Sequence, residues 1–157
     1  MIRYDSYKDS GIEWIGDTPT HWNILKIKNL FSFSKGSGVP KSEVNDSGQS
    51  SCIVYGQLYT KYKGLNVLPD ILSRTDLSKD SSVTSMGNEM LIPGSTTTTG
   101  IDLCNCKTLN YKDVILGGDI IILRPKKQKI SREFYSYFIS TVSKPQFAME
   151  GRGVTIY

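Results

Sequence analysis

The most apolar stretch of the sequence, residues 115–125, predicts the central β-strand of the fold. Within it, Ile120 to Leu123 are four consecutive branched aliphatic residues that follow a Gly-Gly-Asp turn. Branched side chains favour strands, and Pro125 ends the run because it has no backbone N–H to donate to a sheet. An unbroken apolar run of this length indicates a strand buried on both faces, and it favours a strand over a short buried helix.

Weaker apolar patterns predict shorter strands elsewhere, and the polar segments between them predict loops. Residues 32–50 are rich in Ser, Gly, Lys and Asn, and residues 61–64 form a basic, aromatic turn. Residues 73–88 show no strong period, and residues 95–100 form a loop of hydroxyl side chains. The first apolar segment also fits one or two helical turns, but we favour strands near Ile24 to Lys28, at Ser51 to Tyr55, at Met90 to Pro93 and at Leu103 to Leu109.

The clearest helix is predicted over residues 132–142. Ser131 is a suitable N-cap, because its hydroxyl can accept a hydrogen bond from the first helical turn. Lys144-Pro145 ends the helix, since proline cannot continue the helical hydrogen bonds. The spacing of four apolar side chains predicts one apolar face on this packed helix, formed by Phe134, Tyr137, Phe138 and Val142.

Together these elements indicate an α+β fold: a twisted mixed β-sheet with a few packed helices and long loops. A chain of 157 residues can bury a single core, so residues 1–157 are expected to form one domain. The sequence has no internal repeat and no heptad pattern.

Composition points to a cytoplasmic protein. Hydrophobic residues make up 38% of the chain. No apolar run approaches the roughly 18 residues of a membrane-spanning helix. The first five residues lack the charged-then-apolar pattern of a secretory signal.

Positive charge is concentrated in the second half of the chain. The formal net charge is +4. Five cations occur between residues 124 and 132 before any acid, and we call them the basic run: Arg124, Lys126, Lys127, Lys129 and Arg132. Such a cluster suits a polyanion such as DNA. A solvated turn at the end of a strand accounts for it equally well.

The residues usually needed for catalysis are not arranged in any recognisable motif. Cys104-Asn105-Cys106 has no second Cys or His pair to complete a zinc site, so its thiols and that of Cys52 are expected to be ordinary. There is no nucleophile motif and no phosphate-binding Gly-rich loop ending in Gly-Lys-Ser/Thr. His21 is the single histidine, and we expect it to be a surface residue. A catalytic role for His21 is the enzyme alternative.

What remains is recognition chemistry. Gln can bond an adenine edge, and Lys can reach guanine acceptors or phosphates. Structural alternatives apply to each candidate: the tyrosines can be core residues, the threonines an ordinary loop and the lysines simply solvated. The candidate DNA-binding residues are Gln57, Tyr59, Lys61, Tyr62 and Lys63, the hydroxyl residues Ser95, Thr96, Thr97, Thr98 and Thr99, the cations Lys126 and Lys127, and Arg152 between two glycines.

Residues 7–22, YKDSGIEWIGDTPTHW, closely resemble the start of the specificity (S) subunits of type I restriction–modification systems. Those subunits open with Tyr-Lys-(Asp/Pro)-Ser-Gly-x-x-Trp-(Ile/Leu)-Gly, followed by Pro-x-x-Trp. Three later segments resemble the family in the same order. They are Gly56 to Tyr59, Asn88 to Pro93 with the Ser/Thr loop after it, and Gly117 to Ile122 with the helix that follows.

The resemblance implies that the chain is the N-terminal target recognition domain of an S subunit, a fragment without the second domain and the long helices. Each such domain reads one half of a split double-stranded DNA site. S subunits bind modification subunits, which methylate adenine using S-adenosylmethionine, and through them restriction subunits, which cleave using ATP. The chain itself is then non-catalytic and needs no cofactor.

One alternative belongs to a different functional class. The chain can also be interpreted as a protein-interaction module whose loops hold a partner subunit without reading DNA. Affinity for duplex DNA that falls steeply with salt would separate the two hypotheses, because phosphate contacts release counterions.

Overall fold

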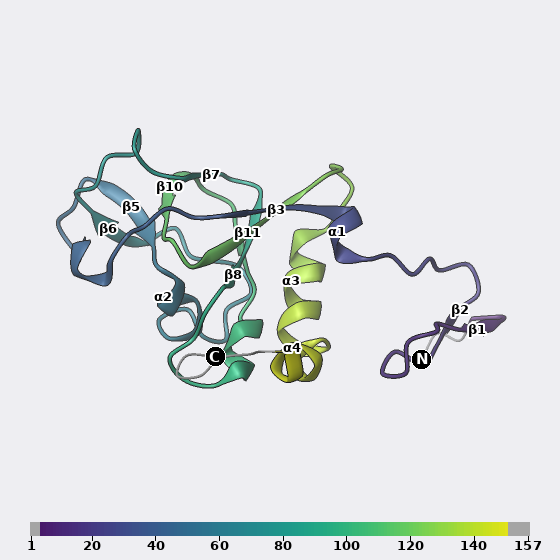
Figure 1. The fold of residues 1–157 in the computed structure, drawn as a ribbon. Helices are drawn as coiled ribbons and strands as arrows, with labels where there is room; N and C mark the ends of the chain where they lie inside the picture. The colour runs from purple at the N-terminus through teal and green to yellow at the C-terminus, as the bar shows by residue number, and fades with distance from the viewer. Residues whose placement is uncertain (1–3, 151–157) are drawn as a thin grey trace.

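The predicted central strand is present over residues 120–125 as strand β11, Ile120–Pro125, inside a four-stranded antiparallel sheet (Figure 1). The first residues of the predicted stretch, 115–116, instead end the preceding strand, which belongs to another sheet. The computed structural model describes residues 4–150. The sheet has the order β3–β11–β8–β9, with β3 at Phe31–Lys35, β8 at Glu89–Pro93 and β9 at Lys107–Leu109. The strands predicted at residues 90–93 and 103–109 are therefore present, although the second begins at Lys107.

Strand β11 is buried on both faces, as predicted. Ile120 and Ile122 are fully buried in the largest apolar cluster, together with Leu91 of β8. Leu123 points to the other face, where it packs in a second cluster with Ile139. The alternation of the two clusters along one strand follows from the two-residue period of a β-strand.

A second, five-stranded sheet supplies the mixed character of the fold. Its order is β4–β6–β5–β10–β7, and the pairing of β5 with β10 is parallel, whereas its neighbours pair antiparallel. The strands are β4 at Val44–Asn45, β5 at Ser50–Ile53, β6 at Ser73–Thr75, β7 at Thr84–Met86 and β10 at Lys112–Leu116. The α+β fold class is confirmed.

The Gly-Gly-Asp turn carries the chain from one sheet to the other. Strand β10 ends at Leu116 and β11 begins at Ile120. At this crossing the backbones approach closely: the Gly117 N–H donates to Ile53 O at 2.9 Å, and a Cβ on Gly36 would overlap the carbonyl of Gly117. Glycine is required at Gly36 because any side chain would push the two segments apart.

The helices are short except for α3. Helix α3 confirms the predicted position and cap, since the Phe134 N–H donates to the Ser131 hydroxyl at 3.3 Å. No helix within residues 4–150 has the length and apolarity to cross a bilayer. The helices are α1 at Ile27–Leu30, α2 at Tyr55–Tyr59, α3 at Arg132–Thr141 and α4 at Lys144–Glu150, with 3-10 turns at Lys41–Glu43 and Gly100–Cys104.

Two local predictions were wrong. No strand forms at residues 24–28; Ile24 and Leu25 are exposed, and the helical turn α1 follows. Residues 32–50, predicted to be a loop, contain most of β3 and all of β4, and residues 73–88, which show no strong period, contain β6 and β7. These polar strands form because pairing with buried neighbours outweighs weak intrinsic propensity.

The apolar face of α3 also differs from the prediction. The side chains that pack inward are Tyr135, Ser136 and Ile139. The Ser136 hydroxyl donates to Cys106 O at 2.9 Å, which fixes the helix to the segment entering β9. Phe134 and Tyr137, expected on the packed face, are 58% and 60% exposed.

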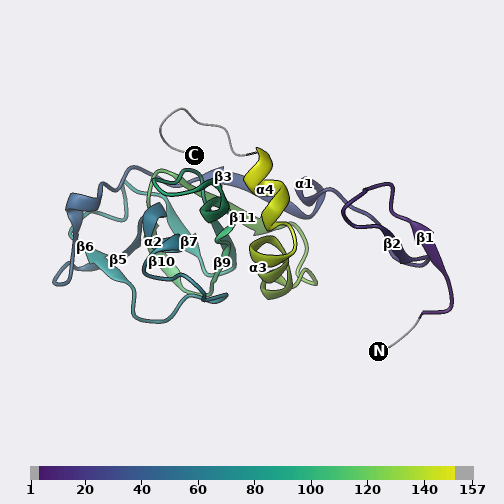
Figure 2. The ribbon, with the colours of Figure 1, turned by 90° about the horizontal axis from the view of Figure 1, so that it is seen from below.

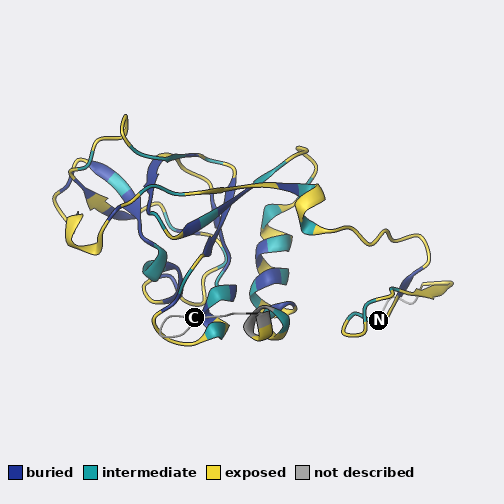
Figure 3. Cartoon of the chain, viewed as in Figure 1, coloured by how far each residue is buried: buried dark blue, intermediate teal, exposed yellow. Residues whose placement is uncertain are grey.

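Residues 4–26 form an N-terminal arm that extends from the body in both views (Figures 1 and 2). The arm contains a two-stranded antiparallel sheet of β1, Tyr7–Asp9, and β2, Asp17–Pro19. Most of its surface is exposed (Figure 3). Trp14 nevertheless touches the body, because its ring centroid lies 6.3 Å from that of Phe138.

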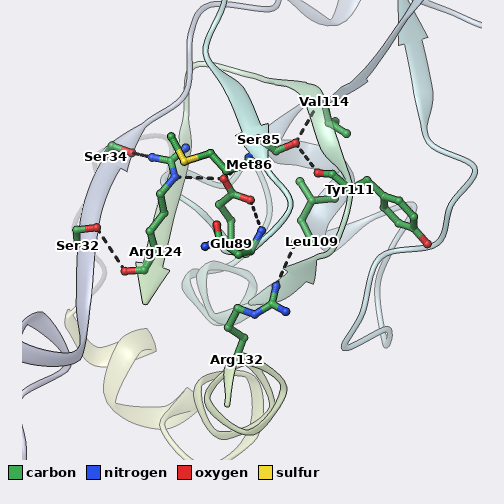
Figure 4. Close-up of polar contacts among 11 residues, drawn as sticks. Ser32, Ser34, Ser85, Met86, Glu89, Leu109, Tyr111, Val114, Arg124 and Arg132 are labelled. Atoms are coloured by element: carbon green, nitrogen blue, oxygen red, sulfur yellow. Dashed lines mark hydrogen bonds and ion pairs between the residues drawn. The ribbon is translucent and has the colours of Figure 1, made fainter. Parts of the chain in front are cut away.

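A buried ion pair joins the strands of the four-stranded sheet (Figure 4). Glu89 of β8 is fully buried, and its carboxylate accepts from the Arg124 Nε at 3.2 Å. The same carboxylate accepts from the backbone N–H groups of Met86 and Asn88. Arg124 also donates to the hydroxyl of Ser34 on β3 at 3.0 Å. The buried carboxylate of Glu89 is therefore both neutralised by a cation and hydrogen-bonded.

The three cysteines are buried and carry free thiols. Burial raises the pKa of the Cys104 thiol to about 11 and that of Cys106 to about 12. Lys107, next in the chain, is also buried and donates to Leu65 O at 2.8 Å, and burial lowers the pKa of its amine. Among residues 4–150 no group of three or more His, Cys, Asp or Glu side chains is placed to hold a metal.

The ion pair predicts a large difference between two similar substitutions. Glu89→Ala removes a buried carboxylate and leaves Arg124 without its partner, so we expect a loss of about 3–5 kcal/mol in the free energy of unfolding. Glu133→Ala removes a carboxylate from an exposed pair with Arg132 and should cost no more than about 1 kcal/mol. Urea unfolding of both variants measures the difference, and equal losses would contradict the role of Glu89.

The thiol of Cys106 predicts a pH dependence of stability. The pKa of this thiol is raised in the folded protein, so folding disfavours the thiolate. The thiol's contribution to the free energy of unfolding is therefore fully present below its unfolded pKa, near 9. As the pH rises from there toward 12, the free energy of unfolding should fall by up to about 1.4 kcal/mol per pH unit because of this thiol. Urea unfolding of the parent and of Cys106→Ala isolates the contribution of the Cys106 thiol, since Lys107 titrates in both. Parallel pH profiles would refute the expectation.

Candidate nucleic-acid interface

A cleft of about 570 Å³ lies between helix α2 and the segment that precedes β4. Its lining comes from parts of the chain that are distant in sequence, including the loop after β8. Half of the lining residues are aliphatic or aromatic, and the others include three threonines, one amide and one amine. The lining residues are Val39, Pro40, Lys41, Val44, Val54, Tyr55, Gly56, Gln57, Tyr59, Thr60, Thr97 and Thr98.

Gln57 fixes the start of α2. Its side-chain oxygen accepts from the Val54 N–H at 3.1 Å, and its amide nitrogen donates to the Ser73 hydroxyl at 2.7 Å. The first bond satisfies a backbone donor that the helix leaves free at its first turn. Both ends of the Gln57 amide are therefore engaged within the chain, so its place in the cleft wall is well determined.

The two tyrosines of this region are largely internal, and the two lysines are exposed. Tyr59 is 4% exposed and Tyr62 is 2% exposed, so only the rim of Tyr59 faces the cleft. The Lys61 amine donates to the Ser73 hydroxyl at 2.9 Å. The Lys63 side chain is 68% exposed and keeps its ammonium at the surface.

The lysine at position 61 also lies near a buried thiol. Burial raises the pKa of Cys52, and the positive charge of Lys61 partly opposes that rise. This thiol lies in β5 and is fully buried. It packs beneath Val39 and Val54, which line the cleft.

The hydroxyl loop reaches the cleft from β8. Its first residue is held by Asp119, whose carboxylate accepts from the Ser95 hydroxyl at 3.1 Å. Thr96 is fully buried, whereas Thr97, Thr98 and Thr99 are exposed. The loop is thus anchored at its base and presents three hydroxyl side chains at its tip.

Contacts between this loop and α2 build one continuous surface. The Thr97 N–H donates to the Tyr59 hydroxyl at 3.4 Å. The Thr98 hydroxyl donates to Asp102 at 2.6 Å, and the Lys63 ammonium lies 3.9 Å from the same carboxylate. Candidates from two distant parts of the sequence therefore meet, and their ammonium and hydroxyl groups can address phosphates or base edges.

Sequence reasoning missed most of the lining of this cleft, including one lysine and one tyrosine. Lys41 and Tyr55 both line the cleft. Lys41 stands in a polar segment with no period, where nothing in the sequence separates it from a solvated lysine; exposed Glu43 is close by in the chain. Tyr55 was assigned to a strand, but it is the first residue of α2.

The structure places the basic run elsewhere. Ile120, at the start of β11, pairs with Pro93 beside the hydroxyl loop, whereas Lys126 follows the far end of the same strand. In Figure 1 the turn after β11 lies near α1, away from α2. Lys126 donates to Lys28 O at 2.8 Å, and Lys127 lies beside it. Arg152 lies outside the described residues.

His21 belongs to the N-terminal arm. It is exposed, and its ring centroid lies 5.4 Å from that of Tyr4. It does not line the cleft.

No protein-family model matches the sequence, and no curated protein matches it significantly. Solved structures do match. The type I restriction–modification S subunit from M. genitalium aligns with a TM-score of 0.55 and 15% identity, over 84% of this chain and 29% of that one. The HsdS subunit from Thermoanaerobacter tengcongensis aligns with a TM-score of 0.59 and 15% identity, over 90% and 32%.

A third match comes from a structural study of complex assembly and conformational transition in the type I restriction–modification system. It has a TM-score of 0.62 and 15% identity, over 95% of this chain and 34% of that one. The chain thus spans about a third of the length of these proteins. The fold implied by the resemblance of residues 7–22 is confirmed: nearly the whole chain folds like part of a type I S subunit.

Proposed function

We propose that the chain is a target recognition domain of a type I S subunit and reads one half of a bipartite site in duplex DNA. One observation carries the proposal. The Gly-Gln-Leu-Tyr segment and the hydroxyl loop, which resemble two segments of that family, lie 38 residues apart at Tyr59 and Thr97 yet meet at one cleft. The shared fold with solved S subunits supports it independently.

Within this proposal, lysines position the DNA and hydroxyl groups read it. Lys41, Lys61 and Lys63 are exposed and suit phosphate contacts, which hold a protein on the duplex without selecting a sequence. Thr97, with its neighbours in the loop, suits base edges, since a Thr hydroxyl both donates and accepts and its methyl can contact thymine. The anchoring of Ser95 by Asp119 fixes where these groups stand.

The remaining parts of the reaction belong to other subunits. The domain acts in the cytoplasm as the non-catalytic part of the complex, and it directs modification subunits, and through them restriction subunits, to the DNA site. A scaffold with loops at one end suits this task, because loop side chains can change while the sheets keep their packing.

Duplex binding tests the phosphate contacts. Affinity for DNA containing the target should fall linearly with salt on logarithmic axes, with a slope of about −0.9 for each neutralised phosphate. Lys41→Gln combined with Lys63→Gln should make the slope shallower by about 2 and weaken binding to all sequences alike. Fluorescence anisotropy of the full S subunit checks this, with Lys8→Gln in the arm as the matched control. A slope that both variants share would count against the cleft surface.

The sequence of the methylated site tests the base contacts. In cells carrying the full subunit, Thr97→Ala should relax one position in one half of the methylated motif, because a base contact is worth about 1–3 kcal/mol of discrimination. Thr20→Ala, an exposed threonine of the arm, should leave the motif unchanged. Methylome sequencing reads both outcomes. A motif unaltered by Thr97→Ala and by replacement of Thr98 and Thr99 would refute base reading by this loop.

A further inference from the structure

The outward face of helix α3 carries an apolar surface that the fold covers only in part, at half-buried Phe138. Four side chains at helical spacing form it, and we call them the aromatic strip: Phe134, Tyr137, Phe138 and Val142. Phe134 and Tyr137 are 58% and 60% exposed, and Val142 is 49% exposed. The rings of Phe134 and Phe138 stack with centroids 6.1 Å apart, so the strip is continuous along the helix.

The inward face of α3 already has its partners, so the strip is not needed to hold the helix on the sheet. Ile139 and Tyr135 pack in the cluster of Leu123, and Ser136 and Ser140 bond to Cys106. An exposed row of large aromatic side chains costs free energy in water, and such patches mark interaction surfaces on soluble proteins. Trp14 of the arm borders the strip through its contact with Phe138.

Positive charge beside the strip indicates that a partner carries acidic groups there. The basic run leads directly into α3, and within residues 124–143 the one acid is Glu133, which pairs with Arg132 at 3.7 Å. Lys127 and Lys129 therefore add positive charge at the end of the strip where Phe134 lies. A partner that covers the strip gains most if it brings acidic groups to this end.

The shape of the strip favours a helix. Its side chains follow one face of α3 from residue 134 to residue 142, a length of about 12 Å. A second helix laid along such a face can interdigitate side chains at i, i+3, i+4 and i+7. A second copy of α3 fits poorly, because its far end, residues 139–144, holds Lys144 and no acid to meet the basic run.

We propose that the aromatic strip binds one amphipathic helix of a partner protein, whose apolar side chains cover Phe134 and Tyr137 and whose acidic end meets Lys127 and Lys129. DNA fits this surface less well than a protein partner does. Protein–DNA interfaces are polar and positively charged, whereas exposed aromatic side chains at the centre of a patch are typical of protein partners. The partner surface is separate from the cleft, so it does not depend on DNA reading.

A designed peptide tests the recognition chemistry directly. The probe is a fluorescent amphipathic peptide of about four helical turns, with Leu at helical spacing on one face and Glu in the first turn. A second version places Glu in the last turn and covers the opposite direction. Anisotropy titrations with the full chain should show saturable binding of one version, and a peptide of the same composition with scrambled Leu positions should not bind.

Variants locate the binding. Phe134→Ser combined with Tyr137→Ser should weaken peptide binding by about tenfold or more, as loss of central aromatic contacts does at interfaces. Lys127→Glu combined with Lys129→Glu should weaken it as well. Ile71→Ser, which alters an 80% exposed apolar side chain outside α3, should change nothing. Melting temperatures confirm that each variant is folded.

Three results would overturn the proposal. The first is binding of neither peptide, or equal binding of the scrambled one. The second is a dimer in light scattering that the Phe134/Tyr137 variant abolishes, which would assign the strip to a second copy. The third is loss of duplex DNA binding in the Lys127/Lys129 variant with peptide binding unchanged, which would assign the basic run to DNA.

Discussion

One buried carboxylate, that of Glu89, ties together three strands of the four-stranded sheet. A charge without access to water must be neutralised and hydrogen-bonded where it stands. Glu89 of β8 meets this demand with Arg124 of β11, and Arg124 in turn bonds Ser34 of β3. The register of β8, β11 and β3 is therefore set by a contact that tolerates no slip, since a shift of one residue would strand the charge.

The position of β8 determines where the hydroxyl loop emerges. The Gly94 N–H, just after β8, donates to Asp119 O at 2.6 Å, and the Asp119 side chain holds Ser95. Asp119 belongs to the turn that carries the chain between the two sheets. Helix α2 leaves β5 of the other sheet close to the same turn, because Gly117 bonds Ile53. The cleft thus forms where the loops of two sheets meet, and its position follows from the packing of both.

Sequence patterns identified the elements that carry strong local signals. The run ending at Pro125, the strand at residues 90–93 and the cap at Ser131 are specified by nearby residues, so they could be predicted. Strand β3 was missed although Phe-Ser-Phe-Ser alternates apolar and polar residues, because it runs into a Ser-, Gly- and Lys-rich segment that was predicted to be a loop. Strands β6 and β7 could not be predicted, because Ser-Arg-Thr and Thr-Ser-Met are too short to show a period and become strands only by pairing with β5 and β10. The position of Lys41 at the cleft depends on the tertiary fold, which no residue pattern in its own segment indicates.

The orientation of α3 was mispredicted for a physical reason that bears on function. Helical periodicity reveals that one face is apolar, but it does not say what covers that face. In α3 the more apolar face, with Phe134 and Tyr137, points outward, and a face containing Ser136 and Ser140 packs inward through hydrogen bonds to Cys106. An isolated domain gains nothing from this arrangement, whereas a domain that works inside an assembly does.

The two ends of β11 consequently carry different chemistry. At the Ile120 end, the cleft combines aliphatic and aromatic side chains with hydroxyls and the amine of Lys41, and Lys61 and Lys63 are exposed nearby. At the Pro125 end, lysines stand beside exposed aromatic side chains. The hydroxyls and lysines of the first surface suit phosphates and base edges, whereas exposed aromatic side chains beside lysines suit a protein surface with an acidic border. The positive charge of the chain therefore divides between two surfaces, and β11, buried on both faces and paired on both edges, keeps them a fixed distance apart.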